Sequence, residues 1–398
     1  MNPIIFALLM IGVGMTALAV PLLWFSRLPL SVRVPLVTFL LAGTLAISLP
    51  AAIELLPALE FYALGIVLPC FMLLPIALSF YVDAITSATP WRWQRKHIRH
   101  AIPIVLAFVG SVNLWVLPKN DLLLIFSDTS DNLRLWPQVV VIYAFIIMIG
   151  WVFLSGYFVI RMLRRLIIYR QSLKQLFANN DQRELYWLSA LVSVLALTWL
   201  LSLMYSIPLL TNQALPLPVE ILVVMYIVLL WILCVFGSRQ QPGFSERYLP
   251  DTATTLVDVA KEPVEKYRKS GLGDTQMQRI ATKIESAMRD QQLFLDPGLS
   301  LPGLASTLQI SPNYISQTLN EALQQTFFDY VNGWRIRYAI PTIIAAEKSI
   351  LDIAMDSGFN ARSSFYKAFK AHTGLTPTQY RQKSEGVSGQ DMDEIKFL

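Results

Sequence analysis

The sequence holds few of the residues from which catalytic and metal sites are built. It has only three histidines and two cysteines among 398 residues, and they show no metal-ligand spacing. It contains no phosphate-binding glycine loop, no HExxH zinc helix and no GxSxG nucleophile turn. These absences predict a protein that is not an enzyme and that needs no cofactor and no metal.

Charge is also scarce. Charged residues make up 15% of the chain and hydrophobic residues 55%, with a mean hydropathy of +0.50, whereas soluble domains average roughly 25% charged residues. The excess of apolar residues lies before residue 238. Cys70 and Cys234 both lie in apolar runs, so we expect buried thiols and no disulfide framework.

Seven apolar stretches are long enough to cross a bilayer, which takes about 20 helical residues. They are residues 3–25, 35–56, 61–84, 99–118, 136–160, 185–208 and 217–237. The first is too long for a cleavable signal peptide and has no basic region before it. The sequence therefore predicts an all-α protein with a membrane bundle of about seven spans.

The loop charges predict the orientation of the bundle. One alternating set of loops carries only Lys119 and Arg134. The other set carries twelve basic residues: Arg27, Arg33, Arg92, Arg95, Lys96, Arg99, Arg161, Arg164, Arg165, Arg170, Lys174 and Arg183. Because basic loops stay in the cytoplasm, we expect the N-terminus outside and the C-terminal part inside. The acidic residues Glu54, Asp83 and Glu220 fall near predicted span ends, where solvation is easy.

The remainder of the chain divides by composition. Residues 1–238 are the expected membrane sensor or anchor, and residues 239–275, with several prolines, are a connector that includes one short helix. We expect residues 276–383 to form a globular domain that opens with a support helix over 276–292. Residues 384–398 are polar and acidic and predict a disordered tail.

Two similar segments in the globular domain each predict a short helix, a sharp turn and a second helix. The first covers residues 299–323 and the second residues 349–381. Ala354 lies 49 residues after Ala305, and Phe369 lies 50 after Leu319. This spacing indicates an internal duplication with one residue added in the second turn. Paired helices with a polar outer face are typical of helix-turn-helix units.

The two segments resemble the AraC/XylS family of bacterial transcription regulators. The resemblance rests on LASTLQISPNYISQTLNEAL in the first and IAMDSGFNARSSFYKAFKAHTGLTPTQYR in the second. It implies two helix-turn-helix units joined by a linker helix, about Asn332 to Glu347, with their second (reading) helices in adjacent major-groove segments. The sequence departs from the family at Gln325, where a glycine usually follows the first reading helix. It also departs at Pro341, which should kink the linker.

The outer faces of the two reading helices supply the candidate DNA contacts. Arg362 can bond O6 and N7 of a guanine together, and Lys367 and Lys370 are expected to meet phosphate. The polar residues of the first helix could read bases or hold phosphate, and an ordinary solvated face is the alternative for any single residue. The predicted set is Asn313, Ser316, Gln317, Asn320, Arg362, Ser363, Tyr366, Lys367 and Lys370.

These features predict a multi-pass regulator of the bacterial inner membrane that couples a membrane or extracytoplasmic signal to gene expression. The expected partners are promoter DNA, the lipid bilayer, RNA polymerase and a second copy of the chain. One alternative is a transporter or membrane enzyme that carries a regulatory helix-turn-helix domain. Another is a C-terminal domain that binds protein and not DNA. The signal, the target genes and the direction of regulation do not follow from the sequence.

Overall fold

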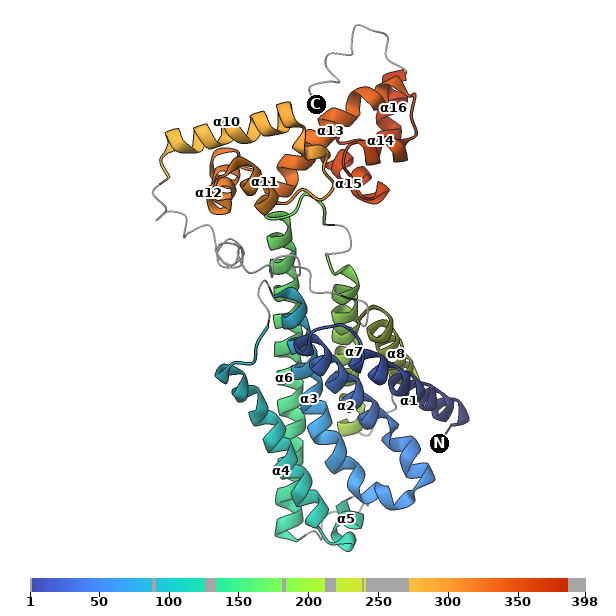
Figure 1. Ribbon diagram of the computed structural model, residues 1–398. Coiled ribbons are helices and arrows are strands. Elements are labelled where there is room, and N and C mark those ends of the chain that lie inside the picture. The colour runs from blue at the N-terminus through green and yellow to red at the C-terminus, as the bar shows by residue number, and fades with distance from the viewer. Residues whose placement is uncertain are drawn as a thin grey trace. The chain divides into compact units, whose positions relative to one another are not determined.

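The computed structural model describes residues 2–87, 91–125, 134–180, 184–211, 220–237, 240 and 272–385. Within these residues the chain is helical (Figure 1) and its only β-type pairing is one isolated bridge. The chain divides into two compact units. The first contains residues 1–167 and 185–245, and the second contains residues 168–184 and 246–398.

The helices of the first unit are mostly long and apolar. They are α1 (Pro3–Trp24), α2 (Leu30–Leu55), α3 (Glu60–Thr86), α4 (Ile102–Val116), α5 (Lys119–Ile125), the first part of α6 (Leu135–Lys174), α7 (Tyr186–Thr211) and α8 (Glu220–Ile232). Each predicted apolar stretch overlaps one of these helices. The last, 217–237, covers α8 and the π-helical η4 (Leu233–Gly237), and its residues 217–219 lie outside the described residues. Five helices in the described part of the chain are long and apolar enough to cross a membrane, judged by length and composition alone. The count of seven spans stays a prediction.

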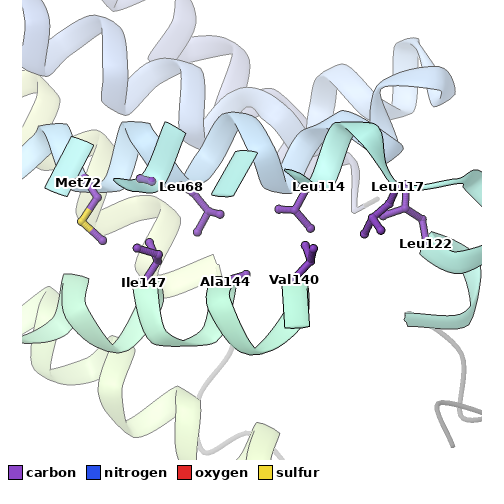
Figure 2. Packing of buried hydrophobic residues seen from close by; sticks show 9 residues of the cluster. Leu68, Met72, Leu114, Leu117, Leu122, Val140, Ala144 and Ile147 are labelled. Carbon is purple, nitrogen blue, oxygen red and sulfur yellow. The ribbon is translucent and has the colours of Figure 1, made fainter. Parts of the chain in front are cut away.

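Apolar side chains join the helices of this unit at regular spacing. Leu68 and Met72 on α3 pack with Leu114 on α4 and with Ala144 and Ile147 on α6, as Figure 2 shows. The residues on each helix are three or four positions apart and therefore lie on one face. Elsewhere in the unit α2 packs on α1 and α3, and α8 packs on α1 and α7.

An ion pair lies inside the first unit. The Asp83 carboxylate at the end of α3 accepts from Arg161 of α6 at 2.5 Å, and Arg161 also donates to Ser79. Asp83 is only 9% exposed, so the expectation that water solvates this carboxylate is wrong. Arg161 lies in a basic loop by sequence, but α6 continues through it, and the continued helix brings the guanidinium back to α3.

The second unit contains the C-terminal domain. Its elements are α10 (Asp274–Gln291), the 3-10 turn η7 (Leu293–Leu295), α11 (Leu301–Leu308), α12 (Pro312–Gln317), the π-helical η8 (Thr318–Ala322), α13 (Phe327–Ala345), α14 (Ile350–Asp356), α15 (Arg362–Thr373) and α16 (Pro377–Glu385). The predicted support helix is α10, and its Ile280, Ile284 and Met288 are buried. The predicted connector helix and most of the predicted tail lie outside the described residues.

The linker helix differs from its prediction. It begins at Phe327, because the Thr326 hydroxyl accepts from the Asp329 amide and caps the helix there. It then runs unbroken through Pro341 to Ala345.

The second unit also takes in the end of α6. Residues 168–184, which the sequence places in the membrane region, group by contacts with the C-terminal domain. This segment consists of the last turns of α6 and the chain that follows it.

Candidate nucleic-acid interface

In the first helix-turn-helix unit, α11 and α12 are joined by a sharp turn. The Ser300 hydroxyl accepts from the Gly303 amide and caps α11. Gln309 ends α11 in the left-handed conformation with φ 54°. The Ile310 amide then donates to the Ala305 carbonyl at 3.1 Å. Together these bonds define where α11 ends and turn the chain toward α12.

The second helix-turn-helix unit has the same hydrogen bonds at the corresponding positions. Ser349 accepts from the Asp352 amide at the start of α14, and the Phe359 amide donates to the Ala354 carbonyl at 3.1 Å. Gly358, with φ 84°, takes the place of the left-handed glutamine. A Cβ at Gly358 would lie 2.7 Å from the Phe294 carbonyl oxygen. This position therefore needs glycine for both its dihedral angle and its close approach.

The duplication extends past the reading helices. Gly374 ends α15 with φ 76°, and Gln324, fifty residues earlier, adopts φ 53°. Thr376 and Thr326 then cap the helices that follow. The residue that stands in the place of the family's glycine is therefore Gln324 and not Gln325.

Aromatic rings hold the second reading helix in place. Phe365 and Phe369 of α15 are fully buried, and their ring centroids are 5.6 Å apart. Phe359 packs on one of them at 5.2 Å and Tyr380 on the other at 5.4 Å. These residues share a core with the inner face of α13. The rotation of α15 about its axis is fixed by this core, and so is the identity of its outer face.

Arg335 of α13 connects the parts of the domain. Its side chain is fully buried, and it donates to the carbonyls of Phe294 at 2.7 Å, Asp296 at 2.8 Å and Ala178 at 3.3 Å. The guanidinium also lies over the Phe359 ring. Burial lowers the pKa of Arg335 to about 10, so the group is charged at neutral pH. One buried cation thus ties the linker helix to both helix-turn-helix units.

The outer face of α15 carries the residues that the sequence predicted there. Arg362, Ser363, Lys367 and Lys370 are exposed, and Tyr366 is half-buried. The Arg362 guanidinium lies 5.0 Å over the Tyr366 ring and donates to its hydroxyl at 2.9 Å. That contact limits the freedom of the guanidinium and aims it along the exposed face.

The face predicted for the first reading helix is partly wrong. Ser316 and Gln317 are only 1% and 3% exposed, whereas Asn313 and Asn320 are half-buried. Helix α10 packs on α12 and η8. In addition, the chain changes from α to π geometry at Thr318, so a face drawn with 3.6 residues per turn no longer holds. Gln317 instead donates to Glu321 within the same helix.

Sequence reasoning also missed two residues of this region. Tyr314 is 41% exposed beside Asn313 on α12, and its place one residue before the inward Ile315 could have revealed it. Thr378 of α16 lies 3.2 Å from the Tyr366 hydroxyl. No local pattern could have shown this second contact, because it joins two different helices.

Comparison with known proteins shows what the C-terminal part of the chain is similar to. Residues 304–383 match the model of a helix-turn-helix domain family. The chain is similar to the melibiose operon regulatory protein of Escherichia coli (strain K12), with 32% identity over 90 residues, which are 23% of this chain and 30% of that protein. It is also similar to an uncharacterised helix-turn-helix-type transcriptional regulator of Staphylococcus aureus (strain COL), with 31% identity over 113 residues, which are 28% and 14% of the two chains.

Among solved structures, the chain is similar to the C-terminal domain of AraT, a response regulator from Geobacillus stearothermophilus. The identity is 28%, the match covers 29% of this chain and 88% of that one, and the TM-score is 0.24. The sequence matches to the Escherichia coli and Staphylococcus aureus proteins each span less than a third of that protein's length. The C-terminal part of this chain is a helix-turn-helix domain of the AraC type, homologous to transcriptional regulators.

Proposed function

We propose that the protein is a membrane-bound, sequence-specific transcription regulator that couples a membrane or extracytoplasmic signal to gene expression. The observation that carries the proposal is the joining, in one chain, of an AraC-type domain and five helices long and apolar enough to span a bilayer. The apolar helices serve as anchor or sensor, and the C-terminal domain binds promoter DNA.

The surface of the first unit supports a lipid environment. Large apolar side chains on its helices are more than half exposed, among them Leu18 at 68%, Ile142 at 59% and Phe153 at 73%. Large apolar side chains exposed in such number are unusual on soluble proteins, whereas lipid chains cover them without cost. Together with the excess of basic residues in one set of loops, this favours a cytoplasmic C-terminal domain and an external N-terminus in the bacterial inner membrane.

The outer face of α15 supports sequence-specific reading. Arg362 presents a planar fork that matches the O6 and N7 atoms of guanine, and Lys367 and Lys370 follow it on the same exposed face. In the first unit Asn313 of α12 and Asn320 of η8 remain candidate contacts, whereas Ser316 and Gln317 would need the packing around them to open. RNA polymerase and a second copy of the chain are the further partners of this proposal.

The test is genome-wide mapping of the DNA that cross-links to the full-length protein in its native membrane. We expect a small number of promoter sites that share one motif with two half-sites. Loss of these sites in an Arg362→Ala variant of equal abundance would tie them to α15. Uniform recovery of DNA without a motif would reject sequence-specific regulation and would favour a C-terminal domain that binds protein.

A further inference from the structure

The chain that follows α6 pairs with the C-terminal domain. We call residues 175–180 together with Glu184 the docking segment. Phe177 and Ser300 form an antiparallel bridge. The Ala178 amide donates to the Leu299 carbonyl at 3.2 Å, and the Leu301 amide donates to the Leu176 carbonyl at 2.9 Å. These bonds place the docking segment against the start of α11, in the first helix-turn-helix unit.

The pairing is buried and reaches the linker helix. Leu176, Phe177 and Ala178 are 0%, 7% and 1% exposed. The Ala178 carbonyl accepts from Arg335 at 3.3 Å, the same arginine that holds the turn before α11. The docking segment is thus packed as an integral part of this unit, and it contacts the residue that links the two helix-turn-helix units.

The far end of the docking segment meets the second reading helix. The Glu184 backbone carbonyl is held by Arg170 of α6 at 2.9 Å. Its carboxylate lies 3.9 Å from the Lys367 ammonium, and its side chain is 16% exposed against 69% for the lysine. A carboxylate beside Lys367 competes with a DNA phosphate for that cation and repels the phosphate as well.

Helix α6 supplies a physical connection to the apolar helices. It runs without a break for 40 residues, from Leu135 to Lys174, and the docking segment follows directly. An α-helix is stiff over this length, so a shift or rotation at one end is carried to the other. A signal that moves α6 would therefore act on the docking segment without any additional element.

We propose that the docking segment is an autoinhibitory strap, which in its docked state sets Glu184 against Lys367 and which must leave before α15 can engage DNA fully. This inference rests on the proposed function, because it assumes that α15 binds DNA. Movement of α6 breaks the bridge at Phe177 and withdraws the Glu184 carboxylate. Lys367 is then available to a phosphate. The hydrogen bond from Arg335 to the Ala178 carbonyl is lost.

The first test removes the charge and keeps the shape. The full-length protein in lipid nanodiscs is titrated against a labelled duplex of about 30 base pairs of random sequence, since phosphate contacts need no particular sequence. We expect Glu184→Gln to bind about twofold to fivefold more tightly than wild type, the range of exposed ion pairs. Glu285→Gln is the matched control, because this α10 carboxylate pairs with Arg289 and changes the net charge equally.

A Lys367→Gln background shows whether the effect passes through the lysine. The gain from Glu184→Gln should shrink in that background, as a double-mutant cycle measures. Equal binding by Glu184→Gln and wild type, or an equal gain in Glu285→Gln, would overturn the strap. If neither the wild-type protein nor Glu184→Gln bound the duplex, the proposed function would fail and the strap with it.

The second test locks the strap. Phe177 and Ser300 face each other as the closer type of antiparallel pair, because the flanking amides and not their own make the bonds, and this suits a disulfide. Phe177→Cys with Ser300→Cys, in a background with Cys70→Ala and Cys234→Ala, is compared oxidised and reduced. We expect the oxidised form to bind the duplex at least about twofold more weakly. Equal or tighter binding after oxidation would reject autoinhibition.

Discussion

At the residue scale, Arg362 is the strongest candidate for reading a base. Its guanidinium is exposed but already held by the Tyr366 hydroxyl and ring, so less side-chain freedom is lost when it binds. We expect Arg362→Ala to cost about 1–3 kcal/mol of binding free energy and to relax preference at one base position. Selection of bound sequences from a randomised library would measure both effects.

Lys370→Ala is the control for this substitution. Lys370 lies on the same exposed face two turns along α15, and a phosphate contact there should weaken binding to all sequences alike. It should also reduce the slope of log K against log salt by about one. If Arg362→Ala behaved in the same way, Arg362 would contact phosphate and not a base.

Arg335 shows how one buried cation stabilises a domain. Arg335→Met would leave three carbonyl acceptors without their donor, those of Phe294, Asp296 and Ala178. Buried polar groups left unpaired are costly, and we expect a loss of about 3–5 kcal/mol of stability. Hydrogen exchange of the amides in α13 and α14 of the full-length protein would report this loss locally.

Arg337→Met is the matched control, two residues further along the same helix. Arg337 is exposed and lies over the Trp334 ring, so its loss should cost less than about 1 kcal/mol. Similar protection in both variants would mean that the carbonyls around Arg335 find other donors, and its linking role would be rejected.

At the element scale, the duplicated turns explain what differs between the two units. The second helix-turn-helix unit has glycine at both of its left-handed positions, 358 and 374. The first helix-turn-helix unit has glutamine at the corresponding positions, 309 and 324. A residue with a side chain is disfavoured there by about 1 kcal/mol or more. The backbone of these turns is therefore strained in the first helix-turn-helix unit and relaxed in the second.

This difference predicts that Gln324→Gly stabilises the domain. The gain should be about 0.5–1 kcal/mol, because relief of the left-handed strain exceeds the added freedom of the unfolded chain. Gln325→Gly is the control, since residue 325 does not have a positive φ, and it should be neutral or destabilising. Denaturant midpoints of the C-terminal domain in the full-length protein would separate them. A gain at 325 and none at 324 would mean that Gln325, and not Gln324, stands in the place of the glycine.

The elements that the sequence predicted well are those defined by local chemistry. A hydroxyl at Ser300 is typical of a helix start, and the four-residue spacing of Ile280, Ile284 and Met288 is typical of one helix face. Helices α11 and α10 confirm both predictions. The predicted linker helix begins too far along the chain because the prediction does not include the cap at Thr326. The burial of Ser316 and Gln317 depends on neighbours distant in sequence and on a π-turn, and periodicity carries no information about either.

At the scale of the whole molecule, the pairing of residues 175–180 with 299–301 was the least predictable feature. It joins segments more than a hundred residues apart through backbone groups, whose bonds leave no trace in residue type. The sequence predicts that Arg170 and Lys174 lie in a basic loop, and this loop bears only on the orientation of the predicted membrane bundle. In the structure that same region is the end of α6 and contributes to the C-terminal unit.

The loop charges predict the orientation of the chain, and this prediction can be measured directly. A fluorescent protein fused after Leu398 should fluoresce and alkaline phosphatase fused there should be inactive, because the first matures in the cytoplasm and the second outside it. Phosphatase fused after Asp131, between Lys119 and Arg134, should be active, since the loops of that set carry only these two basic residues. Phosphatase activity at Leu398 would place the C-terminal domain away from the chromosome. No arrangement of Arg362 and Lys367 on α15 could then regulate a promoter.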